Sequence, residues 1–264
     1  MMACMRSDSD RRLREVWARL ALVTDPELDE PVTELGFVDK VEVDEAEAVH
    51  VHFRLPTYWC AANFAFLMVD DIRKAASVAR ATRVHVRLDD HMHGEVINQG
   101  LAAGADFKAT FGEAEGQDLE ALRLVFRKKA FASRQHKLIE LLLDLGLDDE
   151  RLAAMTTSEL TGMTDLALPF RHARSRYLKL RPIIGGGAPN AFVTESGLPV
   201  TAAHFAAHRS RLRSTDLNLA SNGALCRGLL AARYDEDDSL DRDHLGQPTL
   251  HHFVRRAACQ AAPR

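Results

Sequence analysis

Strict alternation of apolar and polar residues constrains this chain more than any other feature of its sequence. Every second side chain is apolar in residues 41–43, 49–55 and 84–88. A period of two sends neighbouring side chains to opposite faces of a β-strand, so we predict three strands in an antiparallel sheet with one wet face. We expect that wet face to be solvated or to face another domain; it would carry Lys40, His50, His52, Arg54, His85 and Arg87.

Helical periodicity surrounds these strands. Apolar residues recur at a spacing of three to four in residues 10–22, before the first strand, and in residues 61–78, between the second and third strands. The order helix, strand, strand, helix, strand predicts a small α-β-β-α-β domain over residues 10–95. The fold class expected for the whole chain is α+β.

The remainder of the chain is predicted to be mostly helical. Residues 96–116 are rich in glycine, alanine and acids, which is typical of a connector. Residues 117–264 would form a mainly helical C-terminal extension that begins with a long helix over 119–145 and a stop at Gly146. Thr156 and Glu159 have the spacing of a capping box.

Charge and cysteine content exclude several classes of protein. The 264 residues carry a formal net charge of −4, which excludes a general cationic nucleic-acid binder. The apolar runs are too short to span a bilayer, and the N-terminus lacks a hydrophobic signal core. Four widely spaced cysteines without a CxxC pair predict a cytoplasmic protein with reduced thiols, not a disulfide scaffold or a zinc finger.

Cys60 is the first candidate functional residue, because it lies where a predicted strand ends and a helix begins. Free backbone N–H groups and the helix dipole favour a thiolate at such a position. The alternative is a small apolar plug, since free cysteines are often buried. Position alone leaves both interpretations open.

The order of motifs around Cys60 resembles a known family. Asp25-Pro26-Glu27-Leu28, then residues 34–38, two alternating strands and a Pro-Thr loop ending in Cys60 are similar to the small metal–sulfur cluster assembly domain shared by SufT and PaaD. The resemblance covers residues 12–90. It implies a domain that helps to mature iron-containing proteins, with Cys60 as the reactive residue and with Asp25 and Glu27 as its acidic turn.

A histidine-rich segment follows the third strand. His91 and His93, with Glu95, are ligand types that suit iron or zinc, and they would project to one side of an extended segment. The alternative is a polar loop in which one histidine caps the next helix. We include His91 and His93 with Cys60, Asp25 and Glu27 in the predicted ligand set.

Motifs in the extension are weaker. Gly185-Gly186-Gly187 lacks the ending of a phosphate loop and is interpreted as a turn. His204 and His208 have helical spacing but are expected on the surface. Residues 221–228 predict a turn into a helix, where Arg227 would lower the pKa of Cys226, a second reactive-thiol candidate. Residues 235–243 predict an acidic exposed segment.

These features lead to a non-enzymatic maturation factor as the first hypothesis, with iron or an iron–sulfur cluster bound transiently. The partner would be a client metalloprotein; the long form resembles accessory proteins of bacterial multicomponent diiron monooxygenases of the propane-oxidising kind. The extension would bind the client, a homodimer is left open, and neither nucleic acid nor a membrane is expected. The alternatives are a cysteine-dependent enzyme and a non-catalytic adaptor that docks a monooxygenase or chaperone.

Overall fold

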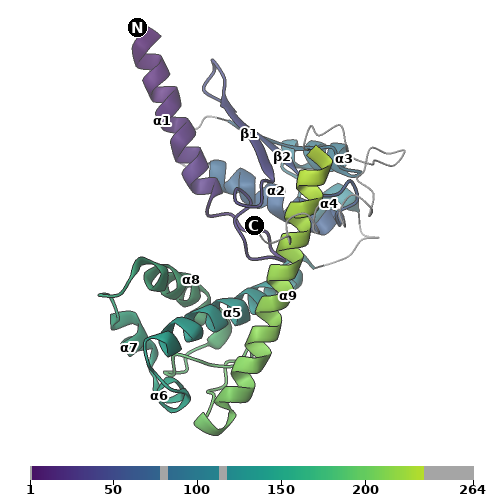
Figure 1. The fold of residues 1–264 in the computed structure, drawn as a ribbon. Coiled ribbons are helices and arrows are strands. Elements are labelled where there is room, and N and C mark those ends of the chain that lie inside the picture. The colour runs from purple at the N-terminus through teal and green to yellow at the C-terminus, as the bar shows by residue number, and fades with distance from the viewer. Residues whose placement is uncertain (1, 78–82, 113–117, 235–264) are drawn as a thin grey trace, which may run out of the picture. The chain divides into compact units, whose positions relative to one another are not determined.

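The computed structural model describes residues 2–77, 83–112 and 118–234, with side chains described from residue 9 onward (Figure 1). The chain divides into two compact units, which we call unit 1 (residues 1–119 and 222–264) and unit 2 (residues 120–221). This division differs from the predicted boundary between the domain and its extension. The reason is that the end of the last described helix returns to unit 1, where Leu230 is buried in the core.

Unit 1 contains a three-stranded sheet in the order β1 (Val38–Val43), β2 (Val49–Arg54) and β3 (Val84–Asp89). β1 and β2 are antiparallel, as expected, but β2 and β3 are parallel, so the prediction of a fully antiparallel sheet is wrong. Helix α2 (Ala62–Ala76) connects β2 to β3 and carries the chain back to the starting end of the sheet. Such a crossover makes the following strand parallel.

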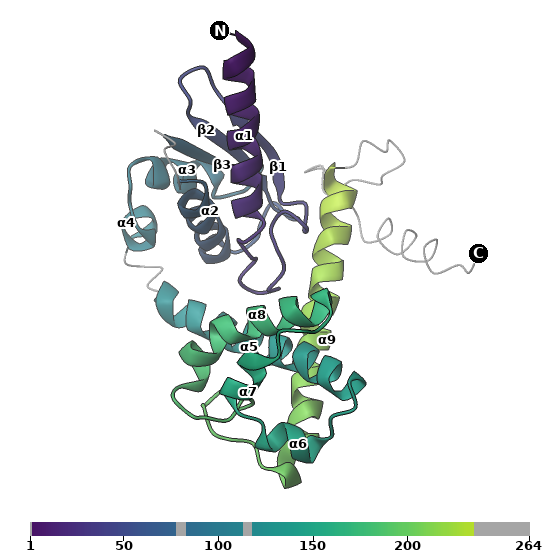
Figure 2. The same cartoon turned by 90° about the vertical axis from the view of Figure 1, so that its left-hand side faces the viewer.

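The apolar face of the sheet packs under two helices. α1 (Met2–Leu20), which begins earlier than predicted, lies beside α2 on one side of the sheet (Figure 2). The predicted apolar face is confirmed, because its side chains are buried or packed against the core: Val41, Val43, Val49, Val51, Phe53, Val84 and Val86.

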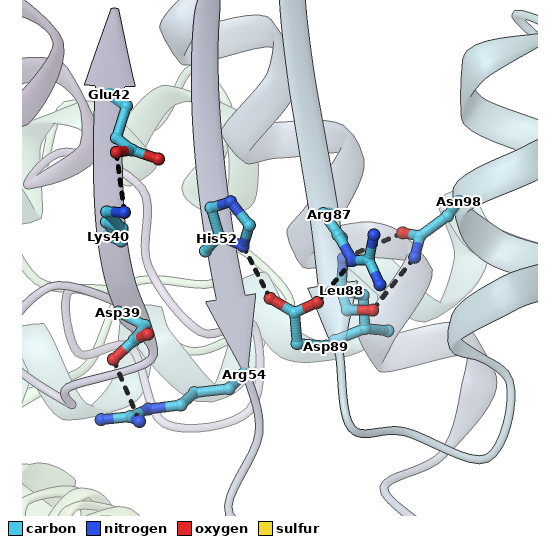
Figure 3. Close-up of polar contacts among 9 residues, drawn as sticks. All are labelled: Asp39, Lys40, Glu42, His52, Arg54, Arg87, Leu88, Asp89 and Asn98. Atoms are coloured by element: carbon cyan, nitrogen blue, oxygen red, sulfur yellow. Dashed lines mark hydrogen bonds and ion pairs between the residues drawn. The ribbon is translucent and has the colours of Figure 1, made fainter.

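The opposite face of the sheet is polar, as predicted, and its side chains pair with one another (Figure 3). Lys40 forms an ion pair with Glu42 at 2.7 Å. Asp89 accepts from His52 Nδ1 at 2.8 Å and from Arg87 Nε at 2.7 Å. The His52–Asp89 pair joins β2 to β3, whereas the other two pairs lie within β1 and within β3. All three pairs are partly or largely exposed, so they account for the charge of these residues without a ligand.

The segment predicted to be a connector belongs to the core of unit 1. It contains α3 (Gly94–Ala102) and α4 (Phe107–Phe111). Ile97, Leu101 and Phe107 are buried with the side chains of the sheet. Ile97 and Leu101 lie four residues apart, so one helical face supplies both.

Unit 2 is helical, as expected. Its elements are α5 (Leu119–Asp144), α6 (Asp149–Ala154), α7 (Thr157–Gly162), α8 (Leu168–Gly185) and the first part of α9 (Ala202–Tyr234). The stop at Gly146 is confirmed by its φ of 88°, and both hydrogen bonds of the Thr156–Glu159 capping box are present. Among the described helices, none combines the length and the apolar composition needed to cross a membrane.

Two predictions about α9 are wrong. The helix continues through residues 221–228 without a turn, and Gly223 lies in its interior, where the Glu30 carboxylate approaches the backbone. His208 is buried rather than on the surface, and its Nε2 bonds Gln135 Oε1 at 2.8 Å. His204 is exposed, as expected. The acidic segment 235–243 lies outside the described residues.

Candidate functional site

The loop between β2 and α2 presents Cys60 one residue before the N-cap of the helix, which confirms the predicted strand-to-helix position. The Cys60 side chain is half-buried against the core of unit 1. Its Sγ lies 3.1 Å from Thr57 Oγ1, within hydrogen-bonding distance. The preceding rings of Tyr58 and Trp59 are 40% and 54% exposed. The loop therefore combines a partly sheltered thiol with an exposed aromatic pair.

The Asp25–Glu27 segment forms a tight turn around a buried carboxylate. Asp25 Oδ1 accepts the backbone N–H groups of Glu27 and Leu28, both at 2.8 Å. Burial raises the pKa of Asp25 to about 6, against the lowering effect of these two hydrogen bonds. The turn therefore holds a carboxyl group that gives up its proton close to neutral pH.

The end of α9 contacts the same two loops. Arg227 forms an ion pair with Glu30, at the end of the acidic turn. Arg233 donates to the carbonyl oxygen of Leu55, at the start of the Cys60 loop, at 3.1 Å and to that of Asp90 at 2.6 Å. Its neighbour Tyr234 stacks under the Arg54 guanidinium, 4.2 Å from the ring centroid. These contacts fix the rotation of α9 in unit 1.

A cavity of about 290 Å³ lies among these three segments. Its polar lining comes from Asp25 and Glu27 on the turn, Cys60 on the loop, and Asn222 and Cys226 on α9. The rest of its lining is mostly apolar: Leu28, Phe37, Leu55, Pro56, Phe64, Met68 and Leu225. The structure thus brings together three of the predicted ligands and adds a second thiol.

Cys226 behaves differently from the sequence expectation. Burial raises the pKa of its thiol to about 12, and the nearby Asp25 and Cys60 act in the same direction. Arg227 lowers this pKa, as expected, but its effect is the smallest of the named influences, so the pKa of the Cys226 thiol is raised overall. Cys226 is therefore a protonated thiol at neutral pH.

His91 and His93 do not line this cavity. His91 is buried, and its Nε2–H donates to the carbonyl oxygen of Cys60 at 2.7 Å. Its Nδ1 accepts the backbone N–H of His93 at 3.1 Å. Because a carbonyl only accepts and an amide N–H only donates, these contacts define a neutral ring with the proton on Nε2. Burial also lowers the pKa of His91. The His91 side chain thus supports the Cys60 loop by bonding the backbone of that loop.

The five predicted ligands do not form one centre. Within the described residues, no group of three or more histidine, cysteine, aspartate or glutamate side chains is arranged to hold a metal ion. His91 instead lies in the wall of a separate cavity of about 470 Å³, with Arg87, Asp89 and Glu95. His93 is the N-cap residue of α3, in keeping with the alternative of a loop that starts a helix. Ligation by these two histidines stays a prediction.

Comparison with known proteins indicates which family the first part of the chain resembles. Residues 13–87, less than a third of the chain, match the family model described as "Iron-sulfur cluster assembly protein". The resemblance expected over residues 12–90 is confirmed for this stretch, which supports a role in assembly or maturation at a coarse level. Asp25, Glu27 and Cys60 lie inside it, whereas Cys226 lies outside. No curated protein and no solved structure was found to match the chain.

Sequence reasoning noticed Cys226 as a thiol but did not connect it with Cys60. The residues are far apart in the chain, and their proximity depends on how α9 packs in unit 1. The only signal in the sequence was the spacing of Gly223, Cys226, Arg227 and Leu230, which places them on one side of a helix.

Proposed function

We propose that this protein is a maturation factor that holds iron, or an iron–sulfur cluster intermediate, at Cys60 and transfers it to a client metalloprotein. The observation that carries the proposal is the shared cavity: the Cys60 thiol opens onto the same space as Asp25 and Glu27. All three residues fall within the stretch that matches the assembly family. Thiolate sulfur and carboxylate oxygen are both ligands that iron accepts. The metal here is cargo.

An incomplete ligand set suits transfer. The described donors do not converge as a closed centre, and a single thiolate cannot complete a tetrahedral site. The donor of the iron, and later the client, would therefore supply the remaining ligands. A bound ion with open positions can be passed on by ligand exchange.

The client we propose is a metalloenzyme such as a multicomponent diiron monooxygenase, served in the cytoplasm, where thiols remain reduced. The exposed rings of Tyr58 and Trp59 immediately precede Cys60. Aromatic side chains are enriched where proteins bind one another. We therefore assign the first contact with the client to this pair, and further recognition to the helical extension.

A cysteine-dependent enzyme would need a histidine base that reaches the sulfur of Cys60. His91 bonds the backbone carbonyl of Cys60 instead, and the hydroxyl of Thr57 lies within hydrogen-bonding distance of Sγ. His91 is thus not aligned as that base. This geometry favours carriage of cargo over nucleophilic turnover.

The test is anaerobic co-expression with a candidate client, followed by iron and sulfide analysis of the purified client. Cys60→Ser removes the thiolate while changing little volume, so we expect client loading to collapse and the stability to change by only roughly 1–2 kcal/mol. Cys4→Ser is the matched control and should load the client as wild type does. If Cys60→Ser also loads the client fully, the carrier proposal is wrong and the adaptor alternative replaces it.

A further inference from the structure

The C-terminal part of α9 brings a second sulfur to the cavity that holds Cys60. Cys226 lines the same cavity of about 290 Å³ and lies close enough to Cys60 for the two thiols to influence each other electrostatically. Asp25 and Glu27 provide carboxylates on the same wall. Two thiols and two acidic side chains therefore line one cavity in a largely apolar setting.

Contacts on both sides of Cys226 fix its position. One residue further on, Arg227 pairs with Glu30, and four residues further on, Leu230 is buried in the core of unit 1. Gly223, three residues before Cys226, allows the helix to approach the Glu30 carboxylate. Residues three and four apart share one side of a helix, so this side of α9 is the one that faces the turn and the cavity.

The anchors of α9 are on the segments that carry the other donors. Glu30 ends the turn that starts at Asp25, and Leu55, whose carbonyl accepts from Arg233, begins the loop that ends at Cys60. A helix held at both segments places its thiol between them. Cys226 lies outside residues 13–87, so the match to the family model does not include it.

We propose that Cys226 is a second thiol ligand of the cargo ion, so that Cys60 and Cys226 together form a two-thiol loading site for ferrous iron. This inference rests on the proposed function and names the donor set of the same site. When a divalent ion binds, each thiol releases its proton to the solvent and its sulfur donates to the metal. Two thiolates favour iron, cobalt or zinc over magnesium and calcium, which prefer oxygen ligands.

The alternative is a purely structural role, in which Cys226 only fills space, as buried cysteines often do. It packs against the core of unit 1, as a plug would. The two roles differ in what replaces the sulfur without loss: a plug tolerates an apolar residue of similar size, whereas a ligand does not. Cobalt(II) makes the difference measurable, because the near-ultraviolet charge-transfer absorption of bound cobalt grows with the number of thiolates.

The experiment uses the full chain with Cys4→Ser and Cys259→Ser, which leaves Cys60 and Cys226 as its two thiols. Cobalt(II) is titrated anaerobically into this protein and into its Cys226→Ser and Cys226→Ala variants. We expect each variant to show about half the charge-transfer intensity per bound cobalt and an affinity lower by on the order of 10- to 100-fold. Excess magnesium should not displace the cobalt from the parent.

Leu225→Ala is the matched control, because Leu225 lines the same cavity without offering a metal ligand. It should keep the full charge-transfer intensity. If Cys226→Ser unfolds, Cys226→Ala preserves an apolar side chain and still tests the ligand. Full intensity in a folded Cys226 variant would overturn the inference and make Cys226 a plug.

The outcomes separate this inference from the proposed function. A Cys60→Ser variant that loses the whole charge-transfer intensity, beside Cys226 variants that lose none, would leave the carrier role of Cys60 standing without a second thiol. Conversely, two cysteines that each contribute half the intensity would establish the site even if Cys60→Ser still loaded the client. In that case the cobalt result would stand while the maturation proposal failed.

Discussion

Buried polar side chains in unit 2 bond backbone carbonyls or one another, whereas one of those in unit 1, Asp25, lines a cavity. Arg181 of unit 2 donates to the carbonyl oxygens of Gly186, Ala188, Asn190 and Ala191. In unit 1, Asp25 lies in the wall of the cavity that also holds two thiols. Arg181 secures the backbone around it, whereas Asp25 both holds its turn and lines a cavity that a ligand could enter. The difference indicates that the buried polar groups of unit 2 stabilise its fold, whereas Asp25 in unit 1 can take part in chemistry.

Among the predicted changes in stability, the loss of the Arg181 side chain should be the largest, and it should affect unit 2. Arg181→Met leaves several buried carbonyl groups after α8 without their donor, so we expect unit 2 to lose about 3 kcal/mol or more. Hydrogen exchange of amides in α5 measures that loss. Trp17 and Trp59 are the two tryptophans of the chain and both lie in unit 1, so their fluorescence reports unit 1 separately.

Arg171→Met is the control for this prediction, because Arg171 is exposed on the same helix. It should change the stability by no more than about 0.5 kcal/mol. Equal losses in the two arginine variants would contradict a structural role for the Arg181 network.

Acid should destabilise unit 2 through His208. Burial lowers the pKa of His208 from 6.5 to about 4, so the unfolded chain takes up a proton at a higher pH than the folded chain does. The stability is therefore complete above about pH 6.5 and falls as the pH drops toward 4, by about 3 kcal/mol in total. Hydrogen exchange in α5 should record the fall.

An NMR titration of the imidazole rings identifies the group responsible. The His208 ring should titrate near pH 4, because a buried imidazole resists charging. His204→Gln, at an exposed position of the same helix, should leave the acid sensitivity unchanged. A His208 ring that titrates near 6.5 would rule out this source of acid sensitivity.

Asp25 should give unit 1 the opposite dependence on pH. Its pKa is raised from 3.8 to about 6 by burial, so the folded state binds a proton that the unfolded state has released. The metal-free unit is then most stable below about pH 4 and loses about 3 kcal/mol as the pH rises through 6. Asp25→Asn removes this penalty, and we expect it to stabilise unit 1 by about 1–2 kcal/mol at pH 7 in urea unfolding followed by tryptophan fluorescence.

The same variant should weaken cobalt binding, because an amide does not replace the carboxylate charge. Glu34→Gln is a control that removes a charge outside the cavity lining. An Asp25→Asn protein that is less stable than wild type at pH 7, and binds cobalt unchanged, would show that Asp25 is there to hold the turn.

Sequence reasoning reached the parts of the molecule that depend on nearby residues. Alternation defined both faces of the sheet, and the motif order placed Asp25 and Cys60 in one domain. The predictions failed where the position of a residue depends on a partner that is distant in the sequence. His208 was expected on the surface, but its partner Gln135 comes from another helix. Similarly, Gly223 indicated a turn in the sequence, but in the structure it lies inside α9, where the Glu30 carboxylate approaches the helix.

The parallel strand β3 illustrates the same limit. Its period of two was visible, but its direction follows from the crossover through α2. The position of Cys226 at the cavity likewise depends on ion pairs and core contacts formed by other residues of α9. Local patterns therefore predict elements and faces, while long-range contacts decide which side chains share a cavity.

The smallest expected effect concerns the Thr57 hydroxyl, 3.1 Å from Cys60 Sγ. Thr57→Val keeps the shape of the side chain and removes one hydrogen bond, so the stability of unit 1 should change by about 1 kcal/mol or less. A hydroxyl that donates to sulfur stabilises the thiolate, which is the form that reacts. Alkylation of Cys60 by iodoacetamide at pH 7 should therefore be slower by a few-fold than in the wild-type protein. A faster reaction would mean that the thiol donates to Thr57, and that this contact protects Cys60 until cargo arrives.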